Sequence, residues 1–339
     1  MADTIRLSLA EAQNLASAAL VASGASAGNA RPTARALVAA EADGQAGHGL
    51  SRVPSYALHV RVGKVDGLAR PALERLGAAA LRVDAAQGFA YPAIEMALDA
   101  LVPLARQAGL ALALIRHSHH FGQAGAHAER LAEQGLVCLV LGNTPKAMAF
   151  WGGKRPAMGT NPIAFAAPLP DGRPPLVIDL ALSVAARGKI VAAQKAGKQI
   201  PAEWAVGPDG QPTTDPDAAL AGALSPIGGP KGAALALMIE VLAAALTGSS
   251  FGWEASSMFD DKGGPPNTGH VLLALDPAPL SGGAYKGRML ELVQAIESEP
   301  GARFPGSRRL EGRERAARDG IQIPAALHAE IQSLINRTA

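Results

Sequence analysis

Residues 110–125, LALALIRHSHHFGQAG, decide the fold because they join a buried strand to a polar turn and a helix. The apolar run at residues 110–115 predicts the strand, and the helical spacing that follows the turn predicts a helix ending at Gly135. Strand, polar turn and helix in this order are typical of α/β folds, which bind ligands at the loop beyond the strand. His120 precedes Phe121 and Gly122, where backbone can approach a ligand closely, so the turn is a candidate site.

The flanking sequence extends this pattern. Alternating or apolar runs predict further strands at residues 80–85, 136–141, 163–167, 176–182 and 270–276. Helical spacing predicts helices at residues 9–24, 31–43, 91–107, 185–196, 233–246 and 285–297, and a last one from residue 325. Ser8 and Glu11 fit a capping box at the start of the first of these helices, and Gly109 is the expected stop of the third. The strand–helix–strand unit within residues 110–141 indicates a mixed or parallel sheet. Asp179 lies inside an apolar strand, where an acid is either paired or functional.

Residues 43–56, DGQAGHGLSRVPSY, contain three glycines that exclude a stable helix in their first half. Ser51 is predicted to cap a new helix. His48 then lies just ahead of that helix and Arg52 just inside it, at the positive end of the helix dipole, which favours an anion such as a carboxylate. An ordinary loop histidine and a surface arginine explain the same residues equally well.

Two further segments could bind phosphate. Residues 228–232, GGPKG, form a glycine-rich turn before a helix, but they lack the order of a Walker motif. Residues 303–318 are strongly basic and follow a Pro-Gly turn, so they are either a solvated face or a bidentate phosphate grip.

Composition narrows the class of protein. The chain has 339 residues, 48% hydrophobic and 18% charged, with a formal net charge of +2, so its charge indicates neither nucleic-acid nor membrane binding. The one cysteine, Cys138, lies in an apolar run and is expected in the core. Residues 1–10 lack a signal-peptide pattern, and no apolar run reaches transmembrane length, so we expect a cytoplasmic protein.

Several motifs are absent. No GxGxxG follows a predicted strand, which argues against an ordinary Rossmann nucleotide site. HExxH and CxxC are missing, so no metal site is predicted, and no GxSxG elbow indicates a hydrolase.

Five motifs in one order resemble the malate/L-lactate dehydrogenase family, which differs from the Rossmann dehydrogenases of the same names. They are HSHHFGQAG (117–125), GTNPIAFAAP (159–168), the strand with Asp179 leading to Ser183, GGPKG (228–232) and RFPGSRR (303–309). The resemblance covers about residues 5–335. The family includes sulfolactate, ureidoglycolate and diketogulonate oxidoreductases, and reductases of the cyclic imines Δ1-piperideine-2-carboxylate and Δ1-pyrroline-2-carboxylate.

The resemblance implies an α/β protein with a mixed, largely antiparallel central sheet flanked by helices, which binds a nicotinamide without a Rossmann fold. Residues 1–75 and 300–339 are expected to form a helical domain, and residues 76–299 a sheet-containing cofactor-binding domain. The resemblance also implies a homodimer that acts on a small carboxylate with NADP, or with NAD.

The resemblance assigns roles to individual residues. His48 matches the proton donor, with His120 as our second choice, and Arg52 and Thr160 match substrate contacts. Cofactor contacts match at His120, Phe121, Gly122, Gln123, Ala124, Ile178, Asp179, Leu180, Gly229, Pro230, Arg303, Gly306, Arg308 and Arg309. This chain has Gly47 where several relatives have a hydroxyl residue that orients the histidine, so another group must hold His48 or its role is weakened.

The leading hypothesis is hydride transfer between a nicotinamide and C2 of a small 2-oxo or 2-hydroxy acid. An arginine suits the carboxylate, and a histidine suits proton transfer near neutral pH. The alternative within the class is reduction of a cyclic imino acid. A protein that kept the fold but lost catalysis is a third hypothesis, disfavoured by the joint presence of His48, Arg52, His120 and Thr160. The arginines around residue 308 favour NADP through its 2′-phosphate.

Overall fold

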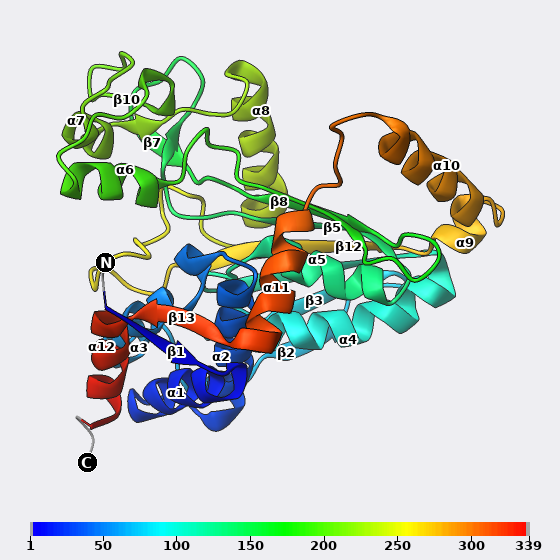
Figure 1. Cartoon of the computed structure of the whole chain (residues 1–339), viewed down its shortest axis with the longest axis horizontal. Helices are drawn as coiled ribbons and strands as arrows, with labels where there is room; N and C mark the ends of the chain where they lie inside the picture. Colours follow the sequence, from blue (N-terminus) through cyan, green and yellow to red (C-terminus); the bar gives the residue numbers. More distant parts are fainter. Residues whose placement is uncertain (1–2, 337–339) are drawn as a thin grey trace.

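The computed structural model describes residues 3–336, and its largest element is a sheet of seven strands (Figure 1). β3 and β4 pair in parallel, whereas every other neighbouring pair in this sheet is antiparallel. This confirms the mixed, largely antiparallel sheet. The order across the sheet is β2 (Ala72–Arg75), β3 (Ala80–Asp84), β4 (Leu110–Ser118), β12 (Thr268–Leu275), β5 (Val137–Gly142), β8 (Ile163–Ala167) and β9 (Leu176–Leu180).

The strand–helix–strand unit is present, but its two strands are not neighbours. β12, from late in the chain, lies between β4 and β5 and pairs antiparallel with both. A distant insertion of this kind leaves no local signal, because periodicity reports the face of a strand rather than its partners.

Helices α4 (Ala90–Ala108) and α5 (Ala124–Glu133) cover one face of the sheet (Figure 1). The covered face is built largely from small side chains, as in the cross-strand row of Ala113, Leu272, Val140 and Ala164, which are all buried. Small residues let the helices approach the strands closely, and Cys138 is buried among them as a free thiol.

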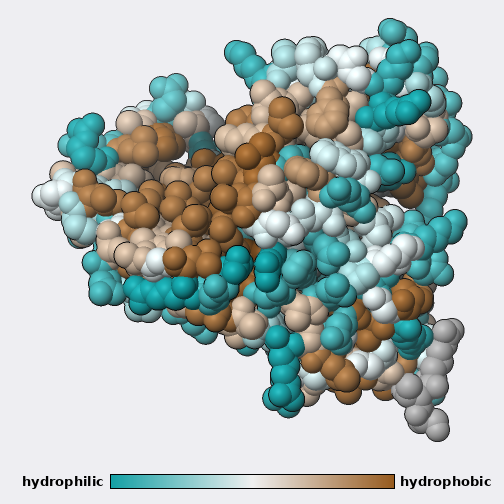
Figure 2. All heavy atoms as spheres, turned by 180° about the vertical axis from the view of Figure 1, so that it is seen from behind, coloured by the Kyte–Doolittle hydropathy of each residue, from teal (hydrophilic) through white to brown (hydrophobic). Residues whose placement is uncertain are grey.

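The opposite face carries larger side chains. Leu112, Leu273, Leu139 and Phe165 form the next cross-strand row, and each of them is only partly buried. Figure 2, seen from behind, shows a broad hydrophobic surface on this side of the molecule. One face of the sheet is therefore closed by helices of the same chain, and the other remains partly open.

The two ends of the chain pack together. β1 (Thr4–Leu7) pairs antiparallel with β13 (Ile321–Pro324), and apolar residues from both ends share one core. Ser8 and Glu11 form the predicted capping box. The helices of this region are α1 (Leu9–Ala22), α2 (Ala27–Ala42), α3 (Val53–Arg61), α11 (Ser307–Asp319) and α12 (Ala325–Asn336).

A third core lies in the middle of the chain, around a small sheet with the order β10 (Ala205–Val206), β11 (Ala223–Leu224), β6 (Met148–Ala149) and β7 (Pro156–Met158). These strands have two or three residues each, too few to show alternation, so the sequence did not predict them. The helices beside it are α6 (Arg187–Lys195), η3 (Ala202–Trp204), α7 (Pro216–Ala221) and α8 (Pro230–Ile239), which continues as a π-helical turn, η4 (Glu240–Ala245).

Two helices complete the described chain. α9 (Pro277–Leu280) and α10 (Tyr285–Ser298) follow β12 and extend from the end of the sheet (Figure 1). None of the described helices combines the length and the hydrophobicity needed to cross a bilayer.

Candidate active site

The glycine-broken segment folds as two short 3₁₀ turns, η1 (Ala46–His48) and η2 (Leu50–Arg52), directly before α3. The prediction that Ser51 caps α3 is wrong, because Arg52 occupies the cap position and Ser51 Oγ donates to the carbonyl of Ala46. Arg52 Nε donates to the carbonyl of Gly47 at 2.7 Å. The loop is therefore closed on itself, which fixes His48 and Arg52 relative to each other.

The structure brings this loop against the turn after β4. The rings of His48 and His120 stack with centroids 5.3 Å apart and planes 13° apart. The hydroxyl of Tyr56, from α3, lies 2.6 Å from His120 Nδ1. The hydroxyl of Tyr91, from α4, lies 3.3 Å from that of Tyr56. We call His48, Tyr56, Tyr91 and His120 the histidine cluster.

Both imidazoles of the cluster are held neutral near pH 7. Burial, reinforced by the charge of Arg52, lowers the pKa of His48 to about 4 and places the pKa of His120 well below its usual value. His48 Nδ1 is buried without a hydrogen-bond partner among the described residues. Nothing in the described chain therefore replaces the missing hydroxyl at Gly47, whereas His120 has a partner that orients it.

Sequence reasoning missed both tyrosines. Tyr56 lies four residues after Arg52, and residues at that spacing share one helix face, so the pairing with the site could have been anticipated. Tyr91 gave no such signal, because its place beside Tyr56 depends on how α4 packs on the sheet.

Arg52 remains available to an anion. Its guanidinium carbon lies 5.2 Å from the ring centroid of Phe259, a largely exposed side chain, and no described residue accepts from its two Nη groups. A planar guanidinium with free Nη groups can bind a carboxylate with two parallel hydrogen bonds. Phe259 belongs to a loop with no periodic pattern, and the sequence analysis did not identify it.

Thr160 belongs to a neighbouring loop rather than to the histidine cluster. Its N–H donates to Thr144 Oγ1 and its carbonyl accepts from the Leu182 N–H. The adjacent Asn161, at a φ of +37°, donates to the buried carboxylate of Glu240 in η4. Glu240, another residue that the sequence analysis missed, thereby fixes the loop that carries Thr160.

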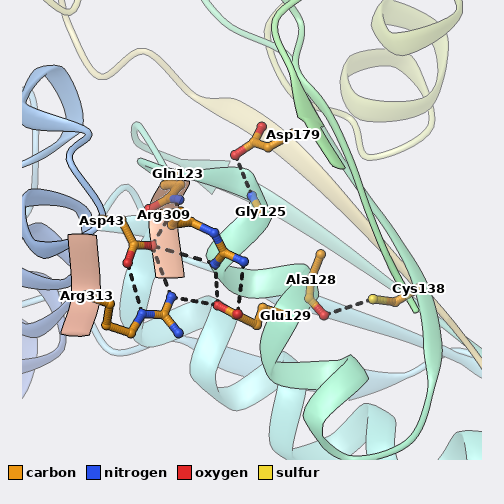
Figure 3. Close-up of polar contacts among 9 residues, drawn as sticks. All are labelled: Asp43, Gln123, Gly125, Ala128, Glu129, Cys138, Asp179, Arg309 and Arg313. Carbon is orange, nitrogen blue, oxygen red and sulfur yellow. Dashed lines mark hydrogen bonds and ion pairs between the residues drawn. The ribbon is translucent and has the colours of Figure 1, made fainter. Parts of the chain in front are cut away.

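The residues predicted beside the nicotinamide lie at the start of α5. Phe121 and Ala124 are buried, and the Phe121 ring stacks on His270, so these two support the turn from within. Gly122 takes a left-handed φ of +69°, as its place in the tight turn requires. Asp179 accepts from the Gly125 N–H at 2.7 Å, which joins β9 to the first turn of α5 (Figure 3).

Asp179 therefore has a hydrogen-bond partner, the Gly125 N–H, which agrees with the first of the two interpretations of an acid in an apolar strand, paired or functional. Ile178 and Leu180 flank it on β9, the edge strand, and Leu180 is exposed. Asp179 as a residue is exposed, but the packing of its carboxyl group against the start of α5 removes water from it and raises its pKa, against the opposing effects of the Gly125 N–H and the charge of Arg309.

Part of the basic segment is used inside the protein. Arg309 is buried and donates to Glu129 at 3.0 Å, and Arg313 donates to both Asp43 and Glu129 (Figure 3). Burial raises the pKa of Glu129, but the hydrogen bonds from the two arginines outweigh it and hold that pKa below its usual value. We call Asp43, Glu129, Arg309 and Arg313 the ion-pair cluster.

The ion-pair cluster connects the chain ends to the candidate site. Asp43 ends α2 just before the His48 loop, and Gln123 Nε2, at the start of α5, donates to Asp43 Oδ2 at 3.2 Å. In this structure Arg309 is thus committed to internal pairing, although it was predicted to contact the cofactor.

Other residues of the predicted cofactor site are free and fit a phosphate-bearing dinucleotide. Arg303 and Arg308 are exposed and unpaired within the described chain. Gly306 begins α11, and Gly229 with Pro230 begins α8; neither helix has a side chain that caps its N-terminal N–H groups. Uncapped helix N-termini and unpaired arginines are the groups that bind phosphate. Within residues 3–336, no three His, Cys, Asp or Glu side chains are arranged to hold a metal ion.

Comparison with known proteins shows the family. Residues 7–332 match the family model described as malate/L-lactate dehydrogenase. The chain is 51% identical over 327 residues to (2R)-3-sulfolactate dehydrogenase (NADP(+)) from Chromohalobacter salexigens, covering 96% of this chain and 97% of the relative. It is 44% identical to Δ1-pyrroline-2-carboxylate reductase from Ancylobacter novellus, covering 98% of each.

The fold agrees with these matches. The crystal structure of Δ1-piperideine-2-carboxylate reductase from Pseudomonas syringae pv. tomato superposes with a TM-score of 0.92 at 40% identity, covering 97% of this chain and 99% of that one. The sulfolactate dehydrogenase of Methanocaldococcus jannaschii superposes with a TM-score of 0.90 at 29% identity, covering 98% and 97%. The chain belongs to the malate/L-lactate dehydrogenase family.

Proposed function

We propose that this protein is an NADP-dependent oxidoreductase that transfers a hydride between the nicotinamide and C2 of a small 2-oxo or 2-hydroxy acid, of the malate, lactate or sulfolactate type. The observation that carries the proposal is the guanidinium of Arg52, whose two Nη groups have no partner among the described residues, close to the stacked imidazoles of His48 and His120. Reduction of a 2-oxo acid requires one group that binds the substrate carboxylate and, next to it, a group that transfers a proton. The relative with 51% identity is named as a dehydrogenase of such an acid.

The substrate carboxylate binds the free Nη groups of Arg52 in this proposal, and Thr160 contacts the substrate from the opposite loop. His48 and His120 form the acid–base pair. Of the two, His120 is the better proton donor, because Tyr56 holds its Nδ1 and leaves Nε2 to face the substrate. His48 keeps an unsatisfied Nδ1, which suits a substrate or nicotinamide contact.

The cofactor lies along the start of α5, β9 and the N-termini of α8 and α11 in this proposal, and when bound it supplies the hydride. Arg303 and Arg308 favour NADP over NAD, because two free guanidiniums can pair with the 2′-phosphate. Dissociation constants of NADPH and NADH measured by fluorescence test this preference, and equal constants would remove the two arginines from the cofactor site.

The alternative is NADPH-dependent reduction of a cyclic imino acid, Δ1-pyrroline-2-carboxylate or Δ1-piperideine-2-carboxylate. The low pKa values of both imidazoles favour it, because a protonated imine brings its own proton and needs no strong acid from the protein. The name of the relative with 44% identity agrees with it.

A panel assay tests the proposed function. NADPH oxidation is followed with sulfopyruvate, oxaloacetate, pyruvate and Δ1-pyrroline-2-carboxylate, and we expect the largest kcat/KM with one of the three oxo acids. Activity on the cyclic compound alone would establish the alternative, and NADPH binding without turnover on any compound would establish loss of catalysis.

We also propose that the protein is a homodimer. The row of Leu112, Leu273, Leu139 and Phe165 is only partly buried, and a broad hydrophobic surface lies on the same side of the molecule (Figure 2). Contiguous apolar surface of this kind often marks an interface, so in the proposed dimer a second copy covers this face of the sheet. Light scattering should give twice the chain mass, and Leu139→Lys should give the monomer mass. A monomeric wild-type protein would contradict the proposal.

The division of labour between domains is a further part of the proposal. Residues 1–75 with 300–339 supply His48, Arg52 and the segment around Arg308, and residues 76–299 supply the sheet and the rest of the cofactor site. We propose a cytoplasmic location, which the free thiol of Cys138 suits.

A further inference from the structure

Two buried tyrosines continue inward from His120. The Tyr56 hydroxyl lies 2.6 Å from His120 Nδ1 and 3.3 Å from the Tyr91 hydroxyl, and the two residues are 2% and 3% exposed. A hydroxyl can donate one hydrogen bond and accept another at the same time. His120, Tyr56 and Tyr91 therefore form an unbroken chain of exchangeable protons that leads away from the substrate.

The far end of this chain reaches a cavity. Tyr91 lines a cavity of about 340 Å³ between α2, α4, α5 and α11, together with polar side chains that include Gln123, His127 and Glu95. One water needs only about 10–15 Å³. Gln123 Oε1 is buried and has no hydrogen-bond partner among the described residues, a state that an ordered water usually relieves.

We propose that Tyr56 and Tyr91 form a proton relay between His120 and water in this cavity. The relay rests on the proposed function, because it serves the reduction of a 2-oxo acid. It resupplies the proton donor through Tyr91 from the cavity between α2, α4, α5 and α11.

The proton balance explains why a relay is needed. During reduction the C2 carbon accepts a hydride, which brings two electrons, and the former carbonyl oxygen accepts one proton from His120 Nε2. A neutral imidazole cannot lose that proton alone, so Nδ1 takes a proton from the Tyr56 hydroxyl at the same time. Tyr91 returns a proton to Tyr56, cavity water returns one to Tyr91, and the hydroxide left in the cavity takes a proton from bulk solvent. The protein therefore stays neutral, with the His120 proton on Nδ1 until the imidazole returns to its Nε2–H tautomer before the next turnover.

The relay separates the two substrate classes. A cyclic imine that arrives protonated becomes an amine on accepting a hydride and requires no proton from His120. Loss of a tyrosine hydroxyl should therefore slow the reduction of a 2-oxo acid and leave the reduction of a cyclic iminium unaffected.

The test is Tyr91→Phe, which removes one oxygen atom from the far end of the chain. The chain's third tyrosine provides the matched control: Tyr285 donates to the carbonyl of Pro168, outside the histidine cluster, so Tyr285→Phe removes the same group elsewhere. With the oxo acid that the wild type reduces best, we expect Tyr91→Phe to lower kcat roughly 10- to 100-fold, within the range of general acid catalysis, and to raise the solvent deuterium isotope effect.

The remaining readouts separate a relay from a structural role. NADPH affinity and the KM of the oxo acid should stay near wild type in Tyr91→Phe, and its Tm should change no more than that of Tyr285→Phe. A wild-type kcat and isotope effect in Tyr91→Phe would overturn the relay while leaving the proposed function intact. If the wild type reduces only the cyclic imine, the proposed function fails and the relay fails with it.

Discussion

His120 lies just before α5 and Glu129 lies within it, so the histidine cluster and the ion-pair cluster adjoin the same segment of the chain, but their polar groups are satisfied in opposite ways. In the ion-pair cluster two carboxylates meet two guanidiniums, and Asp43, Glu129 and Arg309 are almost fully buried. In the histidine cluster the imidazoles are neutral and His48 Nδ1 has no partner among the described residues. The difference teaches that buried imidazoles kept neutral, rather than a concentration of paired charges, distinguish the candidate site.

A fall in pH should affect the stability of the two clusters differently, and we expect it to give the largest effect of the changes considered below. Six of the eight histidines have a lowered pKa when folded: His48, His59, His119, His120, His127 and His270. Below about pH 6.5 the unfolded chain therefore binds more protons than the folded chain. Each extra proton lowers the free energy of unfolding by about 1.4 kcal/mol per pH unit.

We expect Tm to fall steeply between pH 6.5 and 5 in calorimetric scans. Glu129, whose pKa is lowered, loses its contribution only as the pH falls below about 4.3 and through its folded pKa, so the ion-pair cluster should survive this range. A Tm that stays constant down to pH 5 would show that the buried histidines are not held neutral.

The next largest effect shows which of the two imidazoles donates the proton. His120→Gln should lower kcat by about 10²- to 10⁴-fold, because it removes the oriented proton donor, whereas His48→Gln should cost less. NADPH affinity, measured by fluorescence, should fall by much less than kcat in either variant, which separates loss of proton transfer from loss of a cofactor contact. If His48→Gln proves the more damaging, His48 is the donor, as the family resemblance implies.

The ion-pair cluster should matter for stability instead. Glu129→Gln leaves the buried guanidinium of Arg309 and the half-exposed guanidinium of Arg313 short of a carboxylate, and should cost about 3–5 kcal/mol in urea unfolding. Glu297→Gln, which breaks the exposed pair with Arg173, serves as the control and should not change the unfolding midpoint measurably. Equal midpoints in the two variants would mean that the ion-pair cluster is as dispensable as a surface pair.

The smallest of these effects concerns the carboxylate. Arg52→Lys keeps the charge but loses the planar fork, so the KM of the substrate should rise roughly tenfold with a smaller change in kcat. Arg75→Lys, on an exposed strand away from the site, controls for a change of surface arginine. An unchanged KM in Arg52→Lys would remove Arg52 from substrate binding.

The strongly periodic elements could be predicted from the sequence. β4, α4 and its end at Gly109, and the capping box at Ser8 agree with the structure because each depends on a local pattern. The position of β12 between β4 and β5 could not be predicted, since strand order depends on packing between distant segments. Ser51 was misassigned because 3₁₀ turns before α3 moved the helix start to Arg52 and Val53.

The residues of the candidate site fall into the same two groups, those with a local sequence pattern and those that only tertiary packing brings to the site. His48, Arg52 and His120 were identified from local motifs, and the structure brings them together. Tyr91 and Phe259 could not be identified, because only tertiary packing brings them there. The prediction that Arg309 contacts the cofactor overlooked its pairing inside the protein, because the sequence does not show which arginines lie beside buried carboxylates. Arg309 pairs with Glu129, whereas Arg308 is exposed.

A crystal structure with NADP⁺ and oxamate, an unreactive mimic of a 2-oxo acid, would show whether Arg52 and His120 hold the substrate beside the cofactor. We expect the oxamate carboxylate on the Nη groups of Arg52, its carbonyl oxygen within hydrogen-bond distance of His120 Nε2, and the nicotinamide beside both. Oxamate bound elsewhere, or a nicotinamide remote from the histidine cluster in every copy, would contradict it.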